Sequence, residues 1–278
     1  MPTIQNLKKK LQVIHSTKKI TQAMKTASTV KYSKLAALYA DFSKYEEQCS
    51  TMYKTYREDI NSIFSPQNTD APELYVLLSS NKGMCGNFNT DVLGFFAKKF
   101  REQQNQPIVF CCGKKGVEYL DKKRIPYNES FVFDDIPSVS VATEFFDKII
   151  KLIENGVVSD VKIIYPKYVN TMKQYPVCED LLTFDDDTQK GEDPLFVPDK
   201  QTVIHSTAEK ILVSILYRKI LETALGAQAA TLTTMRSAYD TACEYSDQLE
   251  IQINRKRQSQ VTADVIEISS EYSMAEEG

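Results

Sequence analysis

Apolar residues recur at alternating steps of three and four along the first part of the chain, a spacing that gathers them on one side of a helix. The residues in this pattern are Ile4, Leu7, Leu11, Ile14, Leu35, Leu38, Phe42, Tyr45, Cys49, Met52 and Tyr56. Between the two apolar runs, the same positions hold the polar residues Lys18, Thr21, Lys25 and Ser28. Such steps are typical of a coiled coil. They predict a long helix over residues 1–64 whose contact stripe becomes polar near its middle.

A second stripe with helical spacing lies at the other end of the chain. Its residues are Leu225, Ala229, Leu232, Met235, Tyr239, Ala242, Ser246, Leu249 and Ile253. Many residues in this region are Ala or Ser, and small side chains let two helices approach closely. We therefore expect a second long helix over residues 204–278. Because the two helices come from opposite ends of one chain, we expect them to pair antiparallel.

The residues that break helices are confined to the middle of the chain. Nine of the ten prolines lie between Pro66 and Pro198, and seven of the nine glycines lie between Gly83 and Gly191. Relative to alanine, proline costs a helix interior about 3 kcal/mol and glycine about 1 kcal/mol. The two long helices therefore flank a region of different structure, which we place at residues 73–203.

Short apolar runs alternate with amphipathic segments in this central region. The runs predict strands at 74–79, 108–112 and 161–165, and the segments between them predict helices at 89–104, 117–123 and 141–155. This alternation indicates a mostly parallel sheet with helices on its faces. The predicted fold class is α/β: a long antiparallel coiled coil from the N- and C-terminal helices plus a central Rossmann-like, mostly parallel α/β domain.

Charge is distributed unequally along the 278 residues, although 34 Lys+Arg nearly balance 37 Asp+Glu. Residues 1–40 hold eight lysines and no acid, whereas residues 264–278 hold five acids and no base. Basic helices can bind nucleic acid through its phosphates. Here the lysines share their helix with a coiled-coil stripe, and no set of stacking aromatic residues accompanies them. The pattern favours a basic shaft inside an acidic protein cavity, and we expect no binding of nucleic acid.

The sequence also bears on the compartment. It contains no apolar run long enough to cross a membrane, and its start lacks the apolar core of a signal peptide. Its six cysteines are scattered without metal-binding spacing, which is typical of reduced intracellular thiols. We therefore do not expect secretion.

The loop after the first predicted strand is the main candidate for chemistry, because doubly wound folds bind phosphates at that position. It matches neither a GxGxxG fingerprint nor a GxxxxGK[ST] loop, and the later pair Gly113 and Gly116 is a weaker candidate. A tight structural turn is the preferred interpretation, and a nucleotide site is the alternative. The residues assigned to this turn are Ser79, Ser80, Gly83, Cys85 and Gly86. Since Cys85 has no base near it in the sequence, we expect its thiol to pack.

The remaining acidic residues and histidines do not form a recognisable catalytic or metal site in the sequence. The acidic run 185–187 is interpreted as a solvated surface loop rather than a metal site, and His15 and His205 as ordinary helix residues. No acid–base pair and no complete nucleophile constellation emerges from the sequence. We expect no catalysis, no cofactor and no bound metal.

Three segments, in order along the chain, follow the signature of one protein family. They are residues 20–25 with 27–32, residues 79–86, and Met235 with residues 254–262 and 267–268. In these segments and in its three-part organisation, nearly the whole chain resembles the gamma subunit of the F-type rotary ATP synthase, the central rotor shaft.

The resemblance implies a non-catalytic subunit that couples ion-driven rotation to ATP synthesis or hydrolysis. The implied partners are the alpha and beta subunits of the catalytic hexamer, the epsilon subunit and the c-ring of the membrane. Through this complex the chain would lie at the cytoplasmic face of a bacterial cell membrane, with the mitochondrial inner membrane as the second choice. The residues that match family positions near the alpha and beta subunits are Met24, Lys25, Arg257, Gln258 and Thr262.

The sequence also departs from the family pattern. Ala227 and Thr231 stand where the family has Glu and Arg, and Val197 stands where an acid is common. The acidic end at 270–278 replaces a short Gly/Ala-rich end. These departures leave open the shaft of a divergent paralogous rotary ATPase. The sequence is also compatible with a nucleotide-binding α/β domain that carries coiled-coil arms, or with a coiled-coil scaffold.

Overall fold

The computed structural model describes residues 3–56, 59–60, 70–103, 105–181 and 200–276 of the chain. The chain divides into two compact units, one of residues 1–27 and 234–278 and the other of residues 28–233. The domain boundaries expected from the sequence, near 64, 73 and 203, lie in or beside segments outside the described residues. Those boundaries stay predictions.

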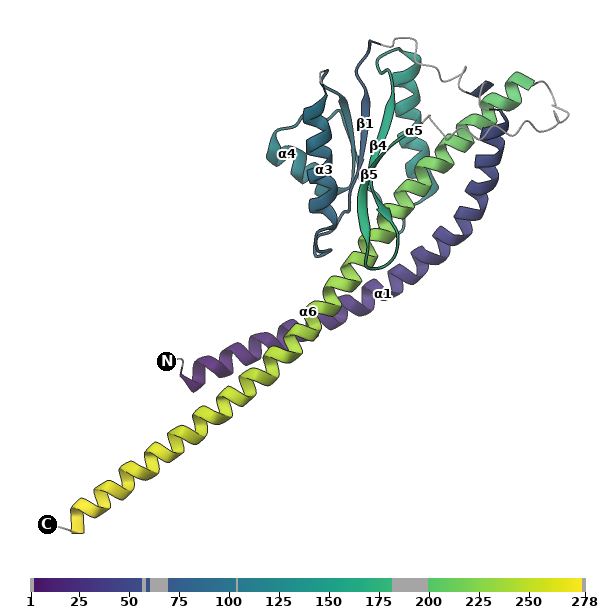
Figure 1. Ribbon diagram of the computed structural model, residues 1–278. Helices are drawn as coiled ribbons and strands as arrows, with labels where there is room; N and C mark the ends of the chain where they lie inside the picture. The colour runs from purple at the N-terminus through teal and green to yellow at the C-terminus, as the bar shows by residue number, and fades with distance from the viewer. Residues whose placement is uncertain (1–2, 57–58, 61–69, 104, 182–199, 277–278) are drawn as a thin grey trace. The chain divides into compact units, whose positions relative to one another are not determined.

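A five-stranded sheet forms the centre of the unit 28–233, with the strand order β3-β2-β1-β4-β5 (Figure 1). Its strands are β1 (Leu74–Leu78), β2 (Ile108–Cys112), β3 (Glu129–Phe131), β4 (Val161–Tyr168) and β5 (Gln174–Asp180). The first four strands run parallel to one another, and β5 runs antiparallel to β4. The mostly parallel α/β domain expected from the sequence is confirmed.

Helices cover both faces of this sheet. They are α1 (Ile4–Thr55), α3 (Phe88–Glu102), α4 (Lys114–Lys123), α5 (Val139–Glu154) and α6 (Lys200–Glu276). Helices α3 and α4 lie on one face, and α5 lies on the other (Figure 1). The first part of α6 belongs to the same hydrophobic core as α5. The three short helices and three of the strands therefore lie where the apolar pattern predicts them.

Side chains of β1 alternate between the two faces, as successive residues of a strand must. Tyr75 and Leu77 pack with α3 and α4, whereas Leu74, Val76 and Leu78 pack with α5 and α6. Because helices cover both faces, all five residues of β1 are buried.

Two strands, β3 and β5, lie outside the segments that the apolar pattern predicts. Strand β3 has three residues, of which only Phe131 is buried, and β5 is an edge strand whose residues are half-buried or exposed. Strand β5 also contains Pro176, which the middle of a sheet excludes. Neither segment has the apolar run by which a buried strand is identified.

In the other unit, the start of α1 pairs antiparallel with the later part of α6. The Nζ atoms of Lys18 and Lys25 lie 5.6 and 5.5 Å from the ring centroid of Tyr239. Leu7, nearer the start of α1, lines a groove with Leu249, farther along α6. In this unit the polar position Thr21 of α1 and the small residues Ala242 and Ser246 of the α6 stripe are buried. The coiled coil expected from the two stripes is confirmed.

Phe145 of α5 tests the larger core. Its ring centroid lies 4.3 Å from that of Phe131 and 5.8 Å from that of Phe110. Phe145→Ala should lower the free energy of unfolding by about 3–5 kcal/mol, because the change removes these contacts and leaves a cavity. Urea denaturation of the full chain measures the loss.

The control for this prediction is Val132→Ala, at a side chain that is 53% exposed. Its expected change is within about 0.5 kcal/mol, as for most surface substitutions. A loss for Phe145→Ala no larger than that of the control would contradict the placement of this core.

Candidate functional site

The five residues that match partner-contact positions lie on the two long helices. Met24 and Lys25 are half-buried on α1, whereas Arg257, Gln258 and Thr262 are exposed on α6. Thr262 donates its hydroxyl to the Gln258 carbonyl at 2.9 Å, so these two residues occupy neighbouring turns. The structure does not gather the five residues in one cluster. Lys25 lies beside Tyr239, eighteen residues before Arg257, which corresponds to about 27 Å along a helix.

The part of α6 that carries Arg257 is exposed on all sides. Among the side chains that the structure describes, Leu249 is the last one on α6 that is buried, and every side chain from 257 to 269 is exposed. Val261, Val265 and Ile268 are 55%, 59% and 64% exposed, and their spacing of four and three places them on one side of the helix. Helices of this kind gain most of their stability from packing, and apolar patches on a surface mark binding sites. We call residues 257–269 the exposed helix end.

The apolar stripe of the exposed helix end is not among the residues predicted from the sequence. Its signal, apolar residues at i, i+4 and i+7, is present in the printed sequence at 261, 265 and 268. Acidic and polar residues such as Asp264 and Glu267 lie between these three positions, and the stripe does not continue the pattern that ends near Ile253. The family motif, in contrast, points to Arg257 and Thr262.

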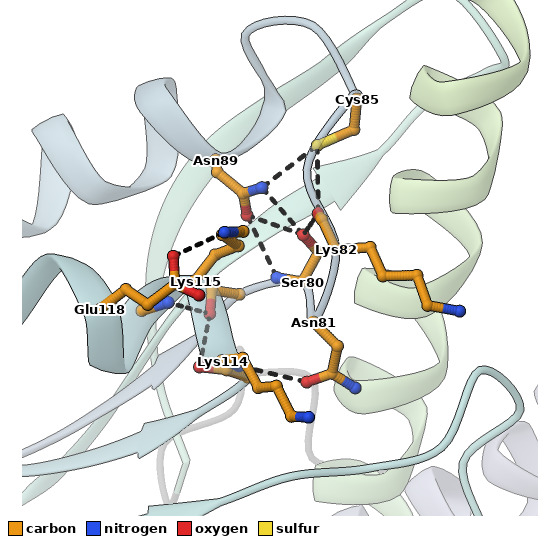
Figure 2. A network of polar contacts seen from close by, with 11 residues as sticks. Ser80, Asn81, Lys82, Cys85, Asn89, Lys114, Lys115 and Glu118 are labelled. Carbon is orange, nitrogen blue, oxygen red and sulfur yellow. Dashed lines mark hydrogen bonds and ion pairs between the residues drawn. The ribbon is translucent and has the colours of Figure 1, made fainter. Parts of the chain in front are cut away.

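The loop after β1 is held by polar contacts with Asn89 at the start of α3 (Figure 2). The Ser80 N–H donates to Asn89 Oδ1 at 3.1 Å, and Asn89 Nδ2 donates to Ser80 Oγ at 2.8 Å and to Cys85 Sγ at 3.1 Å. Burial raises the pKa of the Cys85 thiol, so the thiol is not activated as a nucleophile. These contacts favour the interpretation of the loop as a structural turn.

Further contacts tie the same loop to the rest of its unit. Asn81 donates to the Phe133 carbonyl, and Lys82 forms an ion pair with Asp135 at 2.8 Å. Asp135 also pairs with Lys31 of α1 at 2.5 Å. Hydrogen bonds from Lys31 and then Lys82 lower the pKa of Asp135, so this carboxylate stays ionised and links the loop to α1.

The loop also accepts hydrogen bonds from the backbone N–H groups at the start of α4. In a parallel α/β domain, such groups could bind a phosphate. Lys114 donates its N–H to Asn81 Oδ1 at 3.1 Å, and Lys115 donates its N–H to the Ser80 carbonyl at 3.0 Å. Gly116 donates its N–H to Ser79 Oγ at 2.8 Å. Because the chain itself satisfies these donors, the geometry gives no support to a phosphate site here.

The weaker glycine pair is explained by close approach of two loops. Gly113 adopts φ +108°, and a Cβ atom there would lie 2.2 Å from the Ser79 carbonyl oxygen. A Cβ atom on Gly116 would lie 2.5 Å from Cys111 Sγ and 2.7 Å from Ser79 Oγ. Only glycine lets the loop after β2 approach the loop after β1 so closely.

Small residues of α6 pack against the loop after β1 and the start of α3. Cys85 and Phe88 form a small hydrophobic cluster with Ala227 and Ala230. A Cβ atom on Gly226 would lie 3.0 Å from the Phe88 ring. Ala227, one of the departures from the family pattern, is therefore a packing position between α6 and the loop.

Several residues singled out in the sequence receive no structural account. Residues 185–187 and Val197 lie outside the described residues, as does the side chain of His205. Within the described part of the chain, no group of three or more His, Cys, Asp or Glu residues is placed to hold a metal ion. No helix among the described residues is both long enough and apolar enough to span a membrane.

Gly116 tests the contact between the first turn of α4 and the residues at the ends of β1 and β2. Gly116→Ala should lower the free energy of unfolding by about 1–3 kcal/mol, because the methyl group overpacks a site occupied by Ser79 and Cys111. The matched control is Gly94→Ala in α3, where nothing lies within 4 Å of the added Cβ atom. This control should stabilise the chain by about 0.4–1 kcal/mol. Urea denaturation that gave both variants the same sign would contradict the close approach.

Comparison with known proteins identifies the family. A family model described as ATP synthase matches residues 3–273. The ATP synthase gamma chain of Clostridium beijerinckii is 28% identical over 267 residues, which cover 94% of each chain. The ATP synthase gamma chain of Rubrobacter xylanophilus is 29% identical over 290 residues, which cover 97% of each chain.

Solved structures share the fold of this chain. One is the rotor of the Euglena gracilis mitochondrial ATP synthase, which is 16% identical with a TM-score of 0.66 and covers 93% of this chain and 98% of that one. Another is the central stalk and c-ring of the Tetrahymena thermophila mitochondrial ATP synthase, with a TM-score of 0.64 and coverage of 79% and 99%. The match of the family model over nearly the whole length shows that this chain belongs to the ATP synthase family, in which its curated relatives are gamma chains.

Proposed function

We propose that this chain is the gamma subunit of an F-type ATP synthase, the central-stalk rotor that couples ion-driven rotation of the c-ring to ATP synthesis or hydrolysis. The observation that carries the proposal is the exposed helix end, a helix with an apolar stripe at Val261, Val265 and Ile268 and no buried side chain over 257–269. Such a surface fits a binding site for other subunits. The family of the chain makes the alpha and beta subunits its partners.

The mechanism follows from differential contact. An asymmetric shaft presents a different side to each alpha/beta pair, so each site receives a different interaction energy in its open and closed states. Rotation of the shaft then shifts these populations in sequence, which couples torque to nucleotide binding and product release. The subunit itself catalyses nothing in this mechanism.

The apolar stripe suits a contact that must turn. Hydrophobic attraction is non-directional and proportional to the area removed from water. A stripe of Val and Ile can therefore hold the helix end inside a cavity without fixing one angle through hydrogen bonds. Within this proposal, Met24, Lys25, Arg257, Gln258 and Thr262 are further contacts to the alpha and beta subunits, and Ser79, Ser80, Gly83, Cys85 and Gly86 form a structural turn.

The remaining partners belong to the membrane side of the complex. We assign the epsilon subunit and the c-ring as partners of the α/β domain at residues 73–203. The two gamma chains compared above come from bacteria, which supports a peripheral position at the cytoplasmic face of a bacterial cell membrane. The transported ion is a proton or a sodium ion.

Native mass spectrometry tests the assembly. When the chain is co-expressed with the alpha and beta subunits of its own organism, we expect one copy in a complex with three alpha and three beta subunits. A free chain beside alpha–beta assemblies that lack it would contradict the proposal. That outcome would favour a divergent paralogue or a scaffold.

The triple variant Val261→Ser, Val265→Ser and Ile268→Ser tests the exposed helix end. Full burial of one Val or Ile is worth about 1.5–3 kcal/mol, and 1.4 kcal/mol is a factor of ten, so affinity for the alpha/beta hexamer should fall at least about tenfold. Surface-immobilised hexamer titrated with the full chain measures this affinity.

The control is Val132→Ser, which removes an equally exposed apolar side chain from the α/β domain. Its affinity for the hexamer should equal that of the unaltered chain, and the thermal unfolding midpoints of both variants should stay close to the original. Equal affinity of the triple variant and the control would show that the exposed helix end does not contribute to the interface with the hexamer.

A further inference from the structure

One side chain of α6 reaches both strands at the antiparallel edge of the sheet. Lys219 is 13% exposed, and its Nζ donates to the Tyr165 hydroxyl of β4 at 2.7 Å and to the Glu179 carboxylate of β5. Tyr165 in turn donates its hydroxyl to Glu179 at 3.0 Å. Charge-assisted hydrogen bonds therefore join α6 to two neighbouring strands through a single residue.

A second polar contact lies three residues along the same side of α6. Glu222 is 2% exposed and accepts the backbone N–H of Tyr168 in β4 at 2.8 Å. The Tyr168 hydroxyl lies 2.8 Å from the hydroxyl of Tyr32 in α1, which brings the first long helix to the same point. We call Lys219 and Glu222 with Tyr165, Tyr168 and Glu179 the polar clamp.

The carboxylate at the centre of the polar clamp is held in its charged form. Burial alone would raise the pKa of Glu179, but hydrogen bonds from Lys219 and Lys167 hold this pKa below its usual value. Burial raises the pKa of Tyr165 far above its usual value, so the phenol keeps its proton and donates it to Glu179. The clamp is therefore an ion pair around a neutral hydroxyl.

Apolar side chains also join α6 to the sheet, through a different kind of interaction. Leu216 and Ile220 of α6 are buried in the larger hydrophobic core with Val76 and Ile163 of the sheet. Apolar burial opposes separation of the surfaces but is non-directional. Hydrogen bonds weaken steeply when their angle or length changes. The polar clamp therefore adds directional bonds that oppose rotation or sliding of α6 against β4 and β5 beyond what the packed core supplies.

We propose that Lys219 is a positioning residue for torque transfer: through the polar clamp it holds α6 in one rotational setting on the sheet, so that torque on the α/β domain reaches the shaft without slip. This inference rests on the proposed function. Under that function the α/β domain contacts the rotating ring while α6 continues to the catalytic hexamer. The torque must therefore be transmitted through the contact between the sheet and α6.

Single-molecule rotation of the assembled complex tests the inference, with the hexamer immobilised and a filament attached to the c-ring. Lys219→Met should lose torque under high viscous load, while its unloaded rotation speed and ATP hydrolysis stay unchanged. Glu179 keeps its contact with Lys167 in this variant, at 3.1 Å, so no buried charge is left alone. Lys219→Arg, which retains the cation, should restore torque.

The matched control is Lys167→Met, which removes the other cation from Glu179. Lys167 lies on β4 and is 43% exposed, so its loss changes the charge of the clamp without breaking a link between α6 and the sheet. Torque of this control should equal that of the unaltered complex. Unchanged torque for Lys219→Met, or an equal loss for both variants, would overturn the inference.

Two further outcomes separate the polar clamp from the proposed function. If Lys219→Met does not assemble, the double variant Tyr165→Phe and Glu179→Gln removes the hydroxyl and the carboxylate that Lys219 contacts; unchanged torque in that variant would overturn the inference. If the unaltered chain never enters the hexamer, the proposed function fails. If the unaltered complex rotates and Lys219→Met transmits full torque, only the polar clamp loses its assigned role.

Discussion

Burial of the first part of α6 against the sheet is the contact on which the rest of the unit 28–233 depends. Between Ile211 and Ala230 most side chains are buried, on every side of the helix. A helix that is buried on every side needs a partner on each side. The sheet and α5 provide one side, and Leu35 and Tyr53 of α1 join the same core. This core gives both long helices a defined place on the α/β domain.

Small residues make the close approaches that this arrangement requires. Gly113 and Gly116 admit the loop after β1, and Gly226 admits the ring of Phe88 beside α6. The loop in turn satisfies the first amides of α4 with Ser79 and Asn81. The loop after β1 lies where a doubly wound fold binds phosphate. In this chain the loop instead packs between the start of α4 and α6.

The kind of contact changes along α6 in a way that suits the proposed shaft. Where the helix lies on the sheet, Lys219 and Glu222 add directional hydrogen bonds to an apolar core. Over the exposed helix end, Val261, Val265 and Ile268 offer only apolar surface, and their polar neighbours are exposed. Directional contacts oppose slip, whereas non-directional ones permit turning. A rotor needs both properties at different places on one helix.

The sequence by itself determined the elements whose signal is local. The three-and-four spacing predicted α1 and α6, and apolar runs predicted β1, β2 and β4. These predictions succeed because helix and strand periodicity depend only on residues that are close in the sequence. Half-exposed β5 and the three-residue β3 carry no such signal. The roles of Arg257 and Thr262 come from a motif and stay predictions, and their exposure became known only from the structure. Tertiary structure alone decided that Lys219 meets Glu179, forty residues earlier in the chain, and that Gly116 faces Ser79. Such pairs depend on how the sheet is ordered and how α6 is rotated upon it, and no local pattern records either of these.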